Sequence, residues 1–280
     1  MSMETSTVTS EADVHSEAEV IDNIRHPVAR RIADVLRNRS STPSIILIDD
    51  AENIEQALAS GIRLDSVYTT SKAASDQTPQ LQVSKDVRRY QLDDHLASEL
   101  FGDQRHSRLF ALAHAPRTTV FEDLHGRQGD IVVLDGVRLV GNVGAITRTA
   151  RAMGAAGIIL VDSGLRNAFD RRLIRASRGL VFSLPILLVS RAESLEFLQR
   201  EQVSIATLSA DAESPLRTIR SITDRIAIVL GSERNGVSER LNDSATHRYS
   251  IPMTPGVDSL NVSVAAGIAL YELGARYQSG

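Results

Sequence analysis

The chain has 280 residues, 42% of them hydrophobic, which is enough for one large domain or two ordinary domains with an aliphatic core. It contains no cysteine, which excludes disulfides, thiol catalysis and thiolate metal sites. No apolar run approaches the roughly 20 residues that span a bilayer, and the polar N-terminus is not a secretory signal. We therefore expect a cytoplasmic protein with no membrane partner.

The net charge of −4 hides an uneven distribution, because residues 1–24 hold six acids and neither Lys nor Arg. Only two of the 31 basic residues are lysines, Lys72 and Lys85. The planar fork of arginine suits phosphate, but the codon bias of a GC-rich genome explains a general excess equally well. Local arginine clusters are therefore more informative than the total.

Residues 1–24 are acidic and polar, which predicts a disordered tail. After it, helix-like and strand-like segments alternate about four times, with helices expected at 27–39, 52–60 and 95–102 and strands at 44–49, 64–70, 87–93 and 108–115. This pattern predicts a small α/β/α domain over residues 25–115. Residues 116–129 lack an apolar period and are expected to form a linker.

Residues 130–280 alternate more strongly and predict a second α/β domain. The expected strands are 130–135, 157–161, 183–188, 204–208, 225–230 and 247–251. The expected helices are 144–152, 169–176, 192–201 and 259–277. Nearly continuous apolar strands between helices are typical of a parallel sheet covered on both faces.

Three segments of this domain carry polar and glycine residues directly after apolar runs: 132–155, 226–239 and 249–273. Strand ends at one edge of a parallel sheet can form a single pocket from distant sequence. The first segment is not a dinucleotide turn, because it reads G-N-V-G rather than G-x-G-x-x-G. The second, G-S-E-R-N-G, lacks the Gly-Lys-Ser/Thr element of a phosphate-binding loop.

The ordered motifs are N-x-x-x-x-x-R at Asn142 and Arg148, L-G-S-E at 230–233, and I-P-M followed by S-L-N-V-S within 251–263. This order resembles the SPOUT superfamily of RNA methyltransferases, in the branch that methylates ribose 2′-hydroxyls. Residues 166–184 are most similar to the thiopeptide-resistance enzymes, which methylate an adenosine of 23S rRNA. The small α/β/α domain of residues 25–115 fits the ribosomal-protein-like RNA-binding domain of those enzymes.

The resemblance implies a deep C-terminal trefoil knot, an exception to the usual unknotted connections, and a homodimer. It also implies that S-adenosylmethionine binds in a bent shape, held by backbone groups and sandwiched by aliphatic side chains. The cofactor-binding residues it implies are Arg178, Leu208, Gly231, Ser232, Glu233, Ile251 and Leu260. We expect no metal, because the seven histidines show no ligand spacing and methyl transfer from a sulfonium needs none.

The catalytic residues that the resemblance implies are Arg148, Asn142, Glu233, Ser259 and Asn261. Arg148 is a poor base, so the better hypothesis is that it orients the target phosphate and ribose and stabilises alkoxide charge. Asn142 is expected to position the same ribose or support the loop. Glu233 is expected to orient Asn142 or Arg148, or to face the methylsulfonium; otherwise it serves only a helix N-terminus. Ser259 is also a plausible N-cap.

Arg171, Arg175 and Arg178 fall at i, i+4 and i+7, on one face if the segment is helical. Residues 166–178 hold five arginines and one acid, so we expect phosphate binding by Arg171 and Arg175 rather than a merely solvated face. In the related enzymes the arginine that matches Arg178 reaches the active site, and the sequence leaves open which subunit supplies it. In the first domain, Arg105 and Arg108 match an RNA-contacting loop.

The leading hypothesis is therefore 2′-O-methylation of one adenosine in the thiopeptide-binding region of 23S rRNA, which confers resistance to thiostrepton or nosiheptide. An alternative in the same class is a housekeeping ribose methyltransferase of rRNA or tRNA. A second alternative is an RNA-binding protein that keeps the fold without activity. Binding of S-adenosylmethionine would separate this last possibility from the two enzymes.

Overall fold

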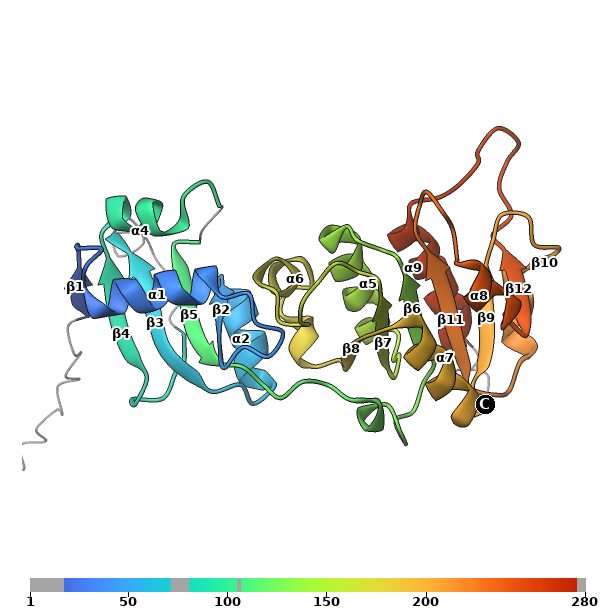
Figure 1. Ribbon diagram of the computed structural model, residues 1–280, viewed down its shortest axis with the longest axis horizontal. Helices are drawn as coiled ribbons and strands as arrows, with labels where there is room; N and C mark the ends of the chain where they lie inside the picture. The colour runs from blue at the N-terminus through green and yellow to red at the C-terminus, as the bar shows by residue number, and fades with distance from the viewer. Residues whose placement is uncertain (1–17, 72–80, 105–106, 276–280) are drawn as a thin grey trace, which may run out of the picture.

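The computed structural model describes residues 18–71, 81–104 and 107–275, and it consists of two α/β domains joined side by side (Figure 1). The first domain contains a five-stranded sheet and the second a seven-stranded sheet. The five-stranded sheet lies within residues 19–114 and the seven-stranded sheet within residues 131–250. The predicted tail is outside the described residues up to residue 17.

The first domain has the strand order β1-β4-β3-β5-β2, in which β5 pairs antiparallel with both of its neighbours. Its strands are β1 (Glu19–Ile21), β2 (Ile45–Asp49), β3 (Leu64–Thr70), β4 (Arg88–Leu92) and β5 (Leu109–His114). Its helices are α1 (Pro27–Arg37), α2 (Ala51–Ala59) and α4 (Asp94–Phe101). Proline stands at the start of α1, where its missing N–H has no helical partner to lose.

The second domain has the strand order β10-β12-β9-β11-β6-β7-β8, and every pair in it is parallel. Its strands are β6 (Ile131–Asp135), β7 (Gly157–Val161), β8 (Ile186–Val189), β9 (Ser204–Leu208), β10 (Ser214–Pro215), β11 (Ile226–Gly231) and β12 (His247–Ser250). Its helices are α5 (Val140–Ala152), α6 (Arg171–Ala176), α7 (Arg191–Arg200), α8 (Glu239–Asp243) and α9 (Val262–Gly274). Short 3₁₀ turns complete the fold at Phe121–Asp123, Leu180–Phe182 and Leu216–Ser221.

The central strands of this sheet are buried on both faces, as their continuous apolar sequence predicts. Alternate residues of a strand point to opposite faces. Val132 and Leu134 of β6 join the apolar cluster that contains α5 and α9 residues. Ile131 and Val133 join the cluster that contains α7 and α8 residues. Helices therefore cover both sides of the sheet and leave its carboxyl edge to loops.

The two domains share a packed junction. One apolar cluster continues from Ile46 and Ile54 of the first domain to Ile174 and Val181 of the second. At Gly179 the chain passes so close to α2 that an added Cβ would lie 2.7 Å from the Cβ of Gln56. The contact is therefore a continuous apolar interface between the domains.

Several boundaries differ from the sequence expectation. Glu19–Ile21 forms β1, which pairs with β4, although these residues were expected to belong to the disordered tail. The expected linker contains Leu124, which is fully buried against the second sheet. The helix expected from Gly144 begins at Val140, and Ser183 precedes β8 rather than starting it. No helix within the described ranges is both long and apolar enough to cross a membrane.

Candidate functional site: a pocket at the carboxyl edge of the second sheet

A pocket of about 310 Å³ lies where β9, β11 and β12 end. β9 pairs in parallel with β11 on one side and with β12 on the other, so the loops that follow the three strands lie at the same edge of the sheet. Leu208 comes from the end of β9, Gly231 from the end of β11, and Ile251 directly follows β12. Of the three segments expected to form one pocket, 226–239 and 249–273 line it together, whereas no residue of 132–155 does, and the end of β9 takes part instead.

Most of the residues predicted to bind a cofactor line this pocket: Leu208, Gly231, Ser232, Glu233, Ile251 and Leu260. Ser259, predicted to be catalytic, lines it too. Sequence reasoning missed further lining residues, namely Ser209, Ala210, Leu230, Asn235, Gly236, Val237, Asn242, Met253, Val262 and Ala265. Three of them, Ser209, Leu230 and Val262, directly adjoin a predicted residue along the chain, and that adjacency is the signal that could have found them.

A tight turn after β11 shapes one wall of the pocket. Ser232 and Gly236 exchange both backbone hydrogen bonds, at 3.1 and 2.9 Å, and Gly236 adopts a φ of 63°. The turn folds back over Gly231, where an added Cβ would lie 1.9 Å from the carbonyl carbon of Gly236. Only glycine fits at position 231, because any side chain would force the turn away from the strand.

Three polar side chains from separate elements meet beside the pocket. The Oε1 atom of Glu233 accepts hydrogen bonds from Asn261 Nδ2 at 2.9 Å and from Asn142 Nδ2 at 3.2 Å. Asn261 Nδ2 also donates to Asn142 Oδ1 at 3.3 Å. Asn142 lies in the first turn of α5, Glu233 follows β11, and Asn261 precedes α9. Of the expected partners of Glu233, Asn142 is the one that it contacts.

Asn261 has a second contact that fixes its orientation. Its Oδ1 accepts from the backbone N–H of Ser263 at 2.9 Å and from the Ser263 hydroxyl at 2.6 Å. Asn261 is therefore the N-cap of α9, and the prediction that Ser259 takes this position is wrong, since the helix begins three residues later than expected. The cap leaves the amide nitrogen of Asn261 directed at Glu233 and Asn142.

A buried carboxylate at the end of β6 holds the loop after β11 in place. Asp135, at the end of β6, is only 2% exposed. Its Oδ2 accepts from the backbone N–H of Ser238 at 2.7 Å, and its Oδ1 accepts from Arg191 Nη2 at 2.7 Å. The hydrogen bond that Arg191 donates to Asp135 raises the pKa of Arg191 above its ordinary value. Sequence reasoning used Asp135 only to mark a strand end and missed this role.

Arg148 is not directed into the polar cluster. It follows Asn142 by six residues on α5, which turns it about 240° around the helix axis and moves it about 9 Å along it. Its side chain is exposed and makes no hydrogen bond or ion pair within the described part of the chain. The helix therefore presents Asn142 and Arg148 on different faces.

Arg178 also lies away from the pocket. It follows the end of α6 with a φ of 53°, so it does not continue the helical face of Arg171 and Arg175 as expected. Its Nη1 atom lies 3.3 Å from Oε1 of Glu52 in the first domain. In a single chain, Arg178 is therefore part of the domain junction.

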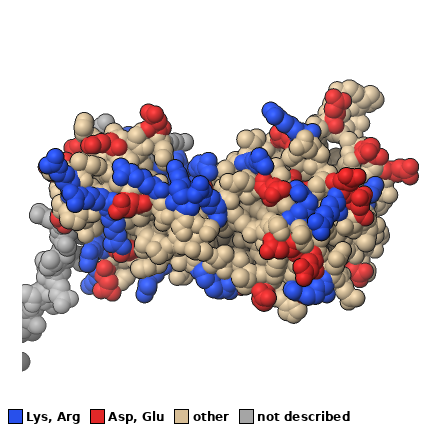
Figure 2. All heavy atoms as spheres, in the orientation of Figure 1, with Lys and Arg blue, Asp and Glu red and all other residues tan. Residues whose placement is uncertain are grey.

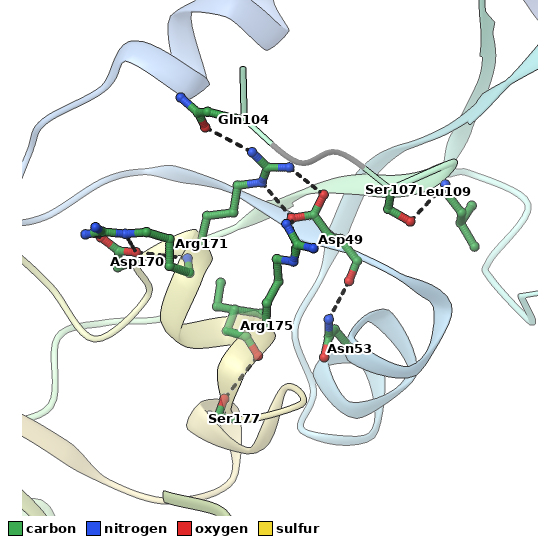
Figure 3. Close-up of polar contacts among 11 residues, drawn as sticks. Asp49, Asn53, Gln104, Ser107, Leu109, Asp170, Arg171, Arg175 and Ser177 are labelled. Atoms are coloured by element: carbon green, nitrogen blue, oxygen red, sulfur yellow. Dashed lines mark hydrogen bonds and ion pairs between the residues drawn. The ribbon is translucent and has the colours of Figure 1, made fainter. Parts of the chain in front are cut away.

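Arg171 and Arg175 of α6 point into the domain junction, as Figure 3 shows. Arg171 donates to both carboxylate oxygens of Asp49, at 2.6 and 2.8 Å, and to Gln104 at 3.1 Å. Asp49 is fully buried, and Nε of Arg175 lies 4.0 Å from it. The expectation of an open phosphate-binding stripe at Arg171 and Arg175 is thereby corrected, since Asp49 already occupies the Arg171 fork.

The loop expected to contact RNA in the first domain is described only in part. Arg108 is exposed next to β5, whereas Arg105 is outside the described residues. Within the described ranges no group of three or more His, Asp or Glu side chains is placed to hold a metal ion. The pocket and the polar cluster beside it are thus the site with the clearest chemistry.

Comparison with known proteins finds a matching family for each of the two domains. Residues 18–127 match the family described as "Thiostrepton-resistance methylase, N terminus", and residues 130–271 match the SpoU rRNA methylase family. The chain is 39% identical over 258 residues to a 23S rRNA (adenosine(1067)-2′-O)-methyltransferase of Streptomyces azureus, covering 92% of this chain and 96% of the relative. It is 40% identical over 260 residues to the protein of the same name from Streptomyces laurentii, with the same coverage.

A similar solved structure is that of an RNA 2′-O ribose methyltransferase. It superposes with a TM-score of 0.76 at 27% identity and covers 92% of this chain and 99% of the solved one. The likeness therefore extends over both domains and over their arrangement.

Proposed function

The chain belongs to the SpoU rRNA methylase family, and from this premise we propose that it is an S-adenosylmethionine-dependent 2′-O-methyltransferase acting on one adenosine of 23S rRNA. The observation that carries the proposal is the pocket after β9, β11 and β12 with the cluster of Glu233, Asn142 and Asn261 beside it. The activity takes place in the cytoplasm, where the ribosome is.

The residues around the pocket suit S-adenosylmethionine. The walls combine aliphatic side chains, such as Leu208, Ile251 and Leu260, with backbone groups of the turn after Gly231. A volume of about 310 Å³ is near the lower end of small-molecule pockets, and a mostly apolar slot with a few polar groups is their usual character. Leu208, Ile251 and Leu260 would hold the adenine ring, and Ser232 and Glu233 would face the polar part of the cofactor.

When bound, S-adenosylmethionine supplies a methyl group on a positively charged sulfur, and transfer to the ribose 2′-oxygen leaves S-adenosylhomocysteine and a proton. Glu233 keeps the two asparagine amides in one orientation through its hydrogen bonds. Asn142 then positions the target ribose. Because α5 presents Arg148 on a different face from Asn142, the guanidinium that binds the adjacent phosphate and stabilises negative charge as the 2′-hydroxyl loses its proton would be the Arg148 of a second copy. Ser259 supplies a further hydroxyl at the pocket wall.

The proposed active form is a homodimer. Val264, Ile268 and Tyr271 are exposed on α9 at helical spacing, and Leu139, which precedes α5, is 63% exposed. Large apolar side chains in such a stripe favour burial against a second copy. A partner would also bring an Arg148 or Arg178 to a pocket that its own chain leaves without one. We include the deep trefoil knot in the proposal because the family resemblance implies it.

The proposed biological outcome is resistance to thiopeptide antibiotics such as thiostrepton, because a methyl group on the target ribose would stand where the drug packs against rRNA. Arg105 and Arg108 are proposed to contact the RNA from the first domain, whereas Arg171 and Arg175 hold the junction that presents it.

Expression of the wild type and of Arg148→Ala in a thiopeptide-sensitive bacterium tests this function. We expect growth in the antibiotic with the wild type only. Ribose methylation of RNA without any gain in tolerance would favour a housekeeping rRNA or tRNA methyltransferase. Absence of S-adenosylmethionine binding by calorimetry would instead favour a non-catalytic RNA-binding protein.

A further inference from the structure

A groove of about 680 Å³ runs along the junction of the two domains, apart from the pocket described above. One wall is the end of α1 with residues 38–47, and the other is formed by residues 164–175. Five of the lining side chains are arginines: Arg39, Arg166, Arg171, Arg172 and Arg175. Figure 2 shows basic side chains gathered where the first domain meets the second.

The groove keeps an excess of positive charge after its ion pairs are counted. Asp49, which is buried under the groove lining, forms an ion pair with Arg171. Asp170 lines the groove and pairs with Arg172 at 2.9 Å. Asp49 is shared between Arg171 and Arg175, so these two acids balance only part of the charge of the five guanidinium groups, and the lining keeps a net positive charge. Arg39, Arg166 and Arg172 are exposed, so their charge faces solvent.

The walls are fixed relative to each other by hydrogen bonds between the domains. Arg166 Nη1 donates to the carbonyl of Arg39 at 2.9 Å, and Asn167 Nδ2 donates to the carbonyl of Ser40 at 3.0 Å. Together with the buried pair of Asp49 and Arg171, these contacts hold the groove open in one shape. A ligand that binds across it needs no rearrangement of the domains, which lowers the entropic cost of binding.

We propose that this groove binds the phosphate backbone of the RNA substrate, an inference that rests on the proposed function. Arginine forks pair with phosphate oxygens, and the amides of Asn38, Gln104 and Asn167 offer further donors along the same walls. The exposed arginines of the groove, Arg39, Arg166 and Arg172, come from both domains, and such a spread suits successive phosphates of a strand better than one small anion. The groove would therefore hold the RNA while the pocket acts on one ribose.

Removal of charge from the groove tests the proposal. Arg39→Gln and Arg172→Gln each remove an exposed charge, and the double variant removes both. Arg200→Gln is the matched control, because Arg200 is a similarly exposed arginine on α7 that does not line the groove. The probes are a 23S rRNA fragment that contains the adenosine named for the Streptomyces azureus relative and an unrelated RNA duplex.

Affinity for both probes is measured by fluorescence anisotropy between 50 and 200 mM salt. Each lost phosphate contact lowers the slope of log affinity against log salt by about 0.7 to 0.9. Between 50 and 200 mM salt, the fall in RNA affinity should be about tenfold smaller for the double variant than for the wild type. At 50 mM salt the double variant should bind RNA about tenfold more weakly than the wild type. The Arg200→Gln variant should match the wild type.

The outcomes separate this inference from the proposed function. A double variant that binds both probes with wild-type affinity and salt slope, while the wild type methylates 23S rRNA, overturns the groove alone. A wild type that transfers no methyl group to 23S rRNA, but binds RNA more tightly than the double variant, supports the groove and overturns the proposed substrate. Wild-type protein that binds neither RNA overturns both. Calorimetry with S-adenosylmethionine should give equal affinities for all variants and so confirm that they are folded.

Discussion

Replacement of Arg171 by methionine should destabilise the protein through the domain junction. The substitution keeps much of the aliphatic stem but removes the two hydrogen bonds to Asp49, of 2.6 and 2.8 Å. Asp49 is fully buried, and removal of one partner from a buried ion pair typically costs about 3 to 5 kcal/mol. Because Arg175 lies 4.0 Å from the same carboxylate, we expect the lower end, about 3 kcal/mol.

A double-mutant cycle isolates this interaction. Asp49→Leu combined with Arg171→Met removes both charges, so the double variant should recover most of the loss seen in either single variant. Urea unfolding followed by circular dichroism gives the free energies, with Arg200→Met as a control at an exposed arginine. An Arg171→Met variant within about 0.5 kcal/mol of the wild type, with no coupling in the cycle, would show that this ion pair does not stabilise the domain junction.

Three further predictions concern the pocket, the proposed catalytic role of Arg148 and the first domain. Gly231→Ala should abolish S-adenosylmethionine binding in calorimetry, because its Cβ would overlap the turn at Gly236; normal affinity would disprove that tight fit. Arg148→Ala should lose methyl transfer while cofactor affinity stays within about threefold of wild type, and wild-type turnover would remove Arg148 from catalysis. Burial raises the pKa of Tyr68 to about 12. In the unfolded chain the hydroxyl of Tyr68 ionises near pH 10. The contribution of Tyr68 to the free energy of unfolding should therefore be fully present below pH 10, and the free energy of unfolding should fall by about 2 kcal/mol towards pH 12. Urea unfolding of Tyr68→Phe should show a shallower decline over this range, and an equally steep one would contradict the assignment.

The sequence predicted the strands of the sheets well because their apolar runs are continuous and end sharply. Leu64–Thr70, Gly157–Val161 and Ser204–Leu208 have the expected limits. β1 could not be recognised, since it is three residues long and its pairing with β4 is supplied by the tertiary fold. Local pattern carries little information about such an edge strand.

The pocket was predictable for a related reason. Parallel strands bring their ends to one edge, so polar residues after β11 and β12 had to approach each other. The partners of individual side chains were not predictable, because they depend on where each helix starts and how the domains dock. Asp49 and Arg171 are 122 residues apart, and the spacing of the α6 arginines does not indicate that a buried carboxylate of the first domain contacts them.

The most direct test of the proposed activity is transfer of a labelled methyl group from S-adenosylmethionine to protein-free 23S rRNA, followed by mass-spectrometric mapping of the modified nucleotide. We predict one ribose-methylated adenosine in the thiopeptide-binding region, and none with Arg148→Ala. Methylation of a base, of a nucleotide elsewhere, or of no RNA at all would contradict it.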